Sequence, residues 1–109
     1  YRPGAGTRIA MAELAHAGGD SHTFAMLDPV SAMTLVAAGA KVVGIDSFNI
    51  DSVHTGERPV HSILLGHDIP IVEHLCGLAQ LPERGSRLFV VPPKIKGVGT
   101  FPIRAFAIA

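Results

Sequence analysis

Short apolar runs alternate with helical patterns along most of this sequence, and local start and stop signals separate them. Asp28 followed by Pro29 predicts a helix start, because an aspartate can cap the helix and proline at the first position lacks only an N–H that would be unsatisfied anyway. Gly39 is a plausible end for this helix. Residues 42–45 are largely β-branched and predict a short buried strand ending at Asp46.

The same alternation continues to the end of the chain. The predicted elements are a helix over residues 59–65 that Gly66 would end, and strands over 69–72, 87–91 and 101–109. The polar segment 46–58 predicts a long loop of the kind often found over a site. Because the strands read as apolar on both faces, we expect an α/β domain with a largely parallel or mixed sheet.

The first part of the chain is less decided. Residues 8–16 could form a short helix that the following glycines would end. We therefore divide the chain into an uncertain segment, 1–24, and a domain portion, 25–109.

Composition excludes several function classes. The 109 residues suffice for one domain, and nine basic side chains balance nine acidic ones, so the average charge predicts no binding to nucleic acid or to an anionic membrane. No apolar run approaches the roughly 18 residues of a membrane span, and no signal-peptide pattern opens the chain. The single cysteine, Cys76, cannot form an internal disulfide, so we expect a cytoplasmic protein.

One histidine and one glutamate are candidate metal ligands. His61 lies on the predicted second helix, and Glu73 follows four apolar residues, where a carboxylate is costly to bury without a cation or a hydrogen-bond partner. Imidazole and carboxylate groups are common ligands of zinc and manganese. By spacing alone, the alternative of a surface histidine and a solvated glutamate stays open. Asp46, directly after a buried strand, is a further candidate, because ligand sites of open α/β sheets lie at the carboxyl ends of strands.

Other polar residues fit ordinary roles better. Asp51, like its serine neighbours, is typical of turn chemistry in which side chains satisfy loop backbone groups. Asp20 and His22 could bind metal, but surface positions explain them more simply. Cys76 reads as a small core side chain with no base placed to activate it.

Four continuous stretches recur in order along the chain: LVAAGAKVVGIDS (35–47), IPIVEHL (69–75), VPPKIKG (91–97) and GTFPIRAFA (99–107). Together they resemble the cyclase family, which includes kynurenine formamidases and isatin hydrolase-like enzymes. The resemblance implies a swivelling β/β/α fold and a zinc or manganese site that hydrolyses an amide, lactam or ester. It also implies that His61 and Glu73 are metal ligands, with Asp46 and His74 as possible neighbours of the ligand set.

The family's main metal motif, His-x-Gly-Thr-His-x-Asp-x-Pro-x-His, has no counterpart in this sequence. We therefore expect the C-terminal portion of a hydrolase that acts on a small molecule and is completed by a complementary chain or segment. A non-catalytic module for binding or assembly is the alternative. A homo-oligomer that pools ligands between subunits is a third hypothesis, although copies of one chain cannot supply the missing motif.

Overall fold

The computed structural model describes residues 27–109, so the predicted helix over residues 8–16 and the candidates Asp20 and His22 lie outside the described part. The described residues fall into two compact units, 27–80 and 81–109, and each is described here by itself. Neither α-helix in residues 27–109 has the length or the apolar content needed to cross a bilayer.

The first helix, α1 (Pro29–Ala37), begins and ends where its local signals predict. The Asp28 side chain accepts a hydrogen bond from the backbone N–H of Ser31, at 2.8 Å, and a second from the Ser31 hydroxyl, at 2.9 Å. After the helix, Gly39 has a φ of +80°, a left-handed conformation that glycine adopts without strain. Both ends of α1 are therefore determined by residues within four positions of them.

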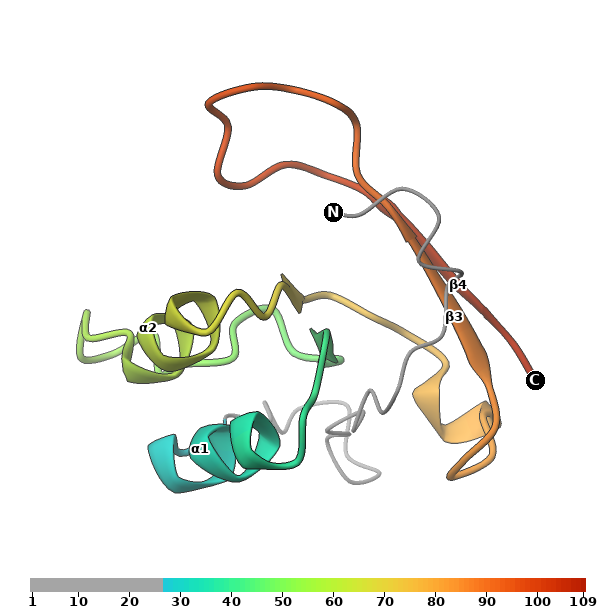
Figure 1. Ribbon diagram of the computed structural model, residues 1–109, viewed down its shortest axis with the longest axis horizontal. Coiled ribbons are helices and arrows are strands. Elements are labelled where there is room, and N and C mark those ends of the chain that lie inside the picture. Colours follow the sequence, from blue (N-terminus) through green and yellow to red (C-terminus); the bar gives the residue numbers. More distant parts are fainter. Residues whose placement is uncertain (1–26) are drawn as a thin grey trace. The chain divides into compact units, whose positions relative to one another are not determined.

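Two very short strands form the sheet of the first unit. The parallel strands β1 (Val43–Gly44) and β2 (Ile71–Val72) pair Val43 with Ile71 and Gly44 with Val72 (Figure 1). The contact continues beyond the strands, where the N–H of Ile45 donates to the carbonyl of Val72 at 2.9 Å. Helix α2 (Pro59–Gly66) lies in the connection between the strands, which makes a β-α-β unit.

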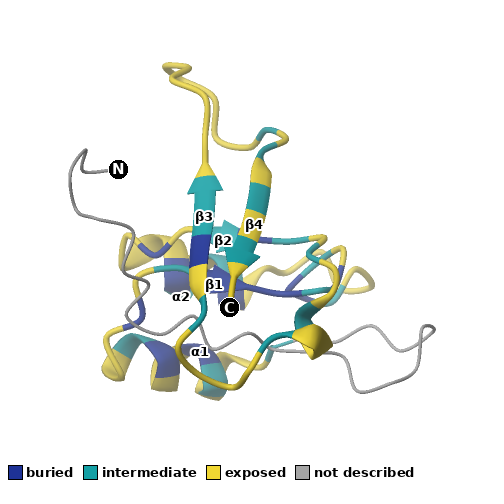
Figure 2. Ribbon diagram, turned by 90° about the vertical axis from the view of Figure 1, so that its right-hand side faces the viewer, coloured by how far each residue is buried: buried dark blue, intermediate teal, exposed yellow. Residues whose placement is uncertain are grey.

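The core of this unit lies between α1, α2 and the β1 strand (Figure 2). Its largest fully buried side chains are Ile45, Ile50, Leu64, Val43 and Val60. The core therefore contains the residues on either side of the loop that precedes α2, and this packing holds the loop in place.

The second unit is an antiparallel pair, β3 (Arg87–Val91) and β4 (Arg104–Ile108). Phe89 lies opposite Phe106, and their rings stack with centroids 4.9 Å apart. The short 3-10 helix η1 (Leu78–Gln80) closes the first unit just before this pair.

One expectation about the strands is wrong. Within residues 27–109 the strands do not form one largely parallel or mixed sheet but two separate two-stranded sheets, one parallel and one antiparallel. Strands β3 and β4 leave apolar side chains exposed, among them Val91, Phe106 and Ile108. The structure therefore supports a small α/β arrangement, and a swivelling β/β/α fold stays an expectation from the resemblance.

Charge is unevenly distributed between the two units, although the whole chain is neutral. Residues 81–109 contain five basic side chains and one acidic side chain. They are Arg84, Arg87, Lys94, Lys96 and Arg104, with Glu83. The overall balance used to predict binding classes therefore averages over a basic unit and an acidic one.

Candidate functional site

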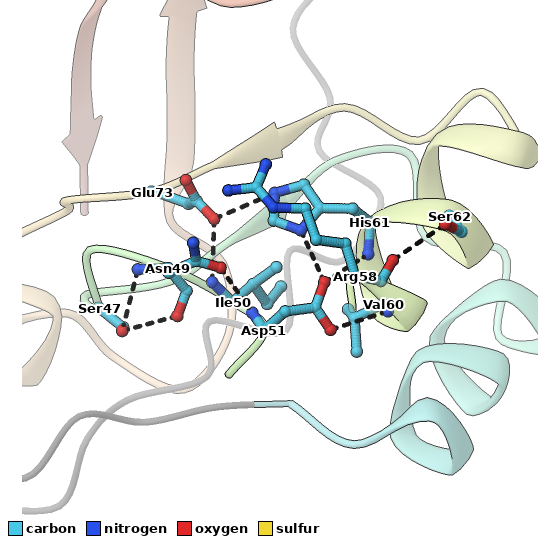
Figure 3. Close-up of polar contacts among 9 residues, drawn as sticks. All are labelled: Ser47, Asn49, Ile50, Asp51, Arg58, Val60, His61, Ser62 and Glu73. Atoms are coloured by element: carbon cyan, nitrogen blue, oxygen red, sulfur yellow. Dashed lines mark hydrogen bonds and ion pairs between the residues drawn. The ribbon is translucent and has the colours of Figure 1, made fainter. Parts of the chain in front are cut away.

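The ring of His61 lies between two carboxylates, one at each nitrogen (Figure 3). Nδ1 is 2.7 Å from Oδ2 of Asp51, and Nε2 is 3.4 Å from Oε1 of Glu73. The histidine side chain is 17% exposed and that of Asp51 is 2% exposed, so the ring is largely sheltered from solvent. The three residues come from a loop, a helix start and a strand end.

Asp51 caps helix α2 from a distance in sequence. Its two carboxylate oxygens accept the backbone N–H groups of Val60 and His61, each at 3.0 Å, in the first turn of the helix. Such groups have no partner within the helix and attract negative charge. The residue at the usual capping position, Arg58, makes no side-chain cap.

Burial and hydrogen bonding act on the pKa of Asp51 in opposite directions. Burial raises it, whereas the hydrogen bonds from the backbone and ring of His61 and the backbone of Val60 lower it. The hydrogen bonds prevail, so the pKa of Asp51 lies below its usual range. Asp51 is therefore a carboxylate at neutral pH.

Glu73 reaches the site from the end of β2. Its Oε1 accepts the backbone N–H of Ile50 at 2.9 Å, and its side chain is 24% exposed. The chain on both sides is fixed, because Ile50 is fully buried and the N–H of His74 donates to the carbonyl of Ser47 at 2.8 Å. The carboxylate of Glu73 is thus oriented by the loop it faces.

The loop before Asp51 is held by its own polar side chains (Figure 3). The hydroxyl of Ser47 donates to the carbonyl of Asn49 at 2.8 Å, and the Asn49 side chain accepts the N–H of Asp51 at 2.9 Å. These are the turn interactions expected of Ser and Asn, and they fix the direction in which Asp51 leaves the loop.

The distance between Nε2 of His61 and Oε1 of Glu73 fits a shared cation. At 3.4 Å it exceeds the usual 2.7–3.2 Å of an N–H···O hydrogen bond. Two ligands held at about 2.1 Å from a tetrahedral zinc ion would be about 3.4 Å apart. The residues present therefore fit two adjacent positions of a tetrahedral zinc site by donor type and by separation.

The other predicted site residues lie around this pair. Asp46 is half-buried directly after Ile45, and His74 is exposed with a left-handed φ of 62°. The ring of His61 contacts Asp51 and Glu73, so the proposed roles of Asp46 and His74 beside the ligands stay predictions. Cys76 is exposed, so its assignment to the core was wrong, because the chain has left β2 and turned into a surface loop there.

Asp51 is the residue that sequence reasoning missed, since it was assigned to ordinary turn chemistry. Two signals could have identified it. It directly follows the apolar Ile50, as Asp46 follows Ile45. Helix α2 starts at Pro59 with Arg58, rather than a Ser, Thr, Asp or Asn, at the capping position. A helix without a local cap requires an acceptor from elsewhere in the fold.

Within residues 27–109, no group of three or more His, Cys, Asp or Glu side chains is arranged to hold one metal ion. Asp51 does not add a third ligand to the pair, because it faces the opposite ring nitrogen.

The sequence is similar to that of a curated enzyme. The kynurenine formamidase of Polaromonas naphthalenivorans (strain CJ2) is 28% identical over 83 residues, which cover 76% of this chain and 37% of that enzyme. No family model matches the sequence. The chain thus matches well under half the length of this curated relative, and the similarity supports a distant relationship with cyclase-like enzymes.

Proposed function

We propose that this chain is part of a metal-dependent hydrolase that cleaves a carbonyl C–N or C–O bond in a small molecule, an amide, lactam or ester. His61 and Glu73 would be two of the ligands of a zinc or manganese ion. The distant similarity to a kynurenine formamidase favours amide hydrolysis within this range.

The separation of 3.4 Å between Nε2 of His61 and Oε1 of Glu73 is the observation that carries the proposal. Residues twelve positions apart in sequence could lie anywhere relative to each other, yet Nε2 of the His61 imidazole and Oε1 of the Glu73 carboxylate lie close enough together to bind one ion. The hydrogen bond from Ile50 supports Glu73 and leaves its second oxygen available. A partly exposed pair of side chains oriented in this way by hydrogen bonds from the protein is suited to binding an ion that also contacts substrate.

Zinc or manganese bound at this position would supply a Lewis acid that polarises the scissile carbonyl and activates water. The protein residues orient that centre: Asp51 holds the ring of His61, and the loop at Ile50 holds Glu73. The buried residues on either side of the loop hold the His61 and Glu73 side chains in position and limit the access of water to them from the side of the core.

The remaining ligands would come from a complementary segment or chain, since hydrolytic zinc sites normally offer three protein ligands. The alternative is a non-catalytic module for binding or assembly. It is favoured by the finding that residues 27–109 contain no group of three metal-binding side chains. The two functions differ in turnover rather than in fold.

Metal binding by the whole chain tests the ligand assignment. We expect zinc or manganese to bind the 109-residue protein together with a polypeptide carrying the His-x-Gly-Thr-His motif, and the variants His61→Ala and Glu73→Gln each to lose most of that affinity in competition with a chromophoric chelator. Matched controls are His54→Ala and Glu83→Gln, whose parent side chains are exposed. Equal metal affinity in His61→Ala and the unmodified chain would refute the assignment.

Turnover separates the enzyme from the binding module. The metal-loaded chain, alone and together with a polypeptide carrying the His-x-Gly-Thr-His motif, is assayed on a formamide, a lactam and an ester. Hydrolysis that disappears in Glu73→Gln and persists in Glu83→Gln supports the enzyme. Metal bound through His61 and Glu73 without hydrolysis of any substrate, even with the complementing polypeptide, favours the module.

A further inference from the structure

We infer that Asp51 is a positioning residue, which holds His61 in the tautomer with the proton on Nδ1 and so presents an unprotonated Nε2 toward Glu73. This inference rests on the proposed function for its purpose, because an unprotonated Nε2 is what a metal ion requires. Its geometry rests on contacts that are independent of any ion.

Each carboxylate oxygen of Asp51 already has a backbone donor. Oδ1 accepts from Val60, and Oδ2 accepts from the N–H of His61 as well as facing the ring. The side chain is 2% exposed, so water does not compete for these contacts. An acceptor fixed in this way cannot rotate to follow the ring, and the ring must adapt to it.

The proton of the neutral imidazole is therefore assigned by Asp51. A carboxylate has no proton to donate, so the 2.7 Å contact requires the proton to be on Nδ1. Nε2 then carries a lone pair directed at Oε1 of Glu73, 3.4 Å away. Two acceptors face each other at that point, which is unfavourable until a cation lies between them.

Without Asp51 the opposite tautomer would be favoured. A proton on Nε2 could be donated to Glu73, and the two side chains would close into a simple hydrogen bond that excludes a metal ion. Asp51 thus prevents His61 and Glu73 from forming a hydrogen bond with each other.

A purely structural role for Asp51 is the competing explanation, because it also caps α2. The two roles can be separated at Arg58, the position before the helix where a serine could supply a local cap. The double variant Asp51→Ala with Arg58→Ser would restore a cap without restoring the contact to the ring. Arg58→Ser alone is the control.

The test uses the full 109-residue chain in four forms: unmodified, each single variant and the double variant. Three quantities are measured: the His61 tautomer in metal-free protein from ¹⁵N NMR shifts at a pH where the ring is neutral, unfolding in urea, and zinc affinity in the presence of the complementing polypeptide with the His-x-Gly-Thr-His motif. We expect the Nδ1–H form in the unmodified chain, and in Asp51→Ala a shift toward Nε2–H with zinc affinity lowered about 10- to 100-fold. The double variant should regain stability but neither the tautomer nor the affinity.

Two results would overturn the inference. One is the Nε2–H tautomer in the unmodified, metal-free chain, a result that does not depend on whether any variant folds. The other is a double variant that regains the Nδ1–H tautomer together with its stability, since Asp51 would then be only a cap. If the tautomer behaves as expected and no form binds zinc even with the complementing polypeptide, the proposed function fails while the positioning role of Asp51 stands.

Discussion

Adjacent leucines on helix α2 offer a matched test of where the core lies. Leu64 is fully buried, whereas Leu65 is 54% exposed on the same helix. Alanine and leucine both favour helices, so replacing either one changes packing with little effect on helix propensity. The perturbations are Leu64→Ala and Leu65→Ala in otherwise identical chains.

The expected magnitudes follow from burial. Removing three buried carbon atoms at Leu64 costs about 2.4 kcal/mol in transfer free energy, and the cavity left in the core raises the cost to about 3 kcal/mol or more. About half of the Leu65 side chain already meets water, so its replacement should cost about 1 kcal/mol or less. The free energies of unfolding should therefore differ by about 2 kcal/mol between the two variants.

Urea unfolding followed by far-ultraviolet circular dichroism measures this difference. The chain contains no tryptophan and one tyrosine, so intrinsic fluorescence would report poorly on the core. With a urea m-value of about 2 kcal/mol/M, the midpoint of Leu64→Ala should lie about 1 M below that of Leu65→Ala. Equal midpoints, or a larger loss for Leu65→Ala, would show that α2 does not bury the face described here.

Three further predictions concern single elements. Asp28→Ala should destabilise α1 at neutral pH. Because hydrogen bonds hold the pKa of folded Asp28 below its ordinary value, the difference from the unmodified chain should begin to shrink near pH 4, at about the ordinary pKa, and should be lost only as the pH falls through the lower folded-state pKa, as measured by urea unfolding across pH. Gly39→Ala should lower the free energy of unfolding by about 1 kcal/mol because of the positive φ of Gly39, although the added methyl would meet open space. Gly66→Ala should be neutral or raise the free energy of unfolding by up to about 1 kcal/mol. A loss at Gly66 equal to that at Gly39 would contradict this reasoning. Phe106→Ala should remove the stack with Phe89 and speed hydrogen exchange of the β3–β4 amides about fivefold, and unchanged exchange would mean that the stack does not stabilise the pair.

The elements themselves were largely predictable from local sequence. The limits of α1 follow from Asp28, Pro29 and Gly39, and β3 spans the predicted residues 87–91. The prediction over residues 101–109 was too long, because only Arg104–Ile108 finds a partner strand. Capping, proline geometry and side-chain periodicity act over a few residues, so they can be read without knowing the fold.

The composition of the sheets was decided by tertiary structure. Apolar runs indicate strands but do not specify which runs pair, and here β1 pairs with β2 while β3 pairs with β4. The position of Cys76 depended on the same choice, since the chain leaves the core as soon as β2 ends. Pairing depends on loop closure and packing over tens of residues, which no local pattern contains.

For the candidate site, the sequence determined which groups are available, and only the fold determined how they meet. His61 and Glu73 were chosen for their chemistry, their positions and a resemblance, but the 3.4 Å separation arises because the β-α-β unit brings the start of α2 to the end of β2. The sequence around Asp51 is typical of a turn. In the fold Asp51 caps helix α2 and contacts the His61 ring, because the buried residues Ile50 and Val60 hold it next to the start of that helix. A side chain's chemistry is carried by the residue itself, whereas its partners are set by the packing of the whole core, and that is why the tertiary structure was needed to find them.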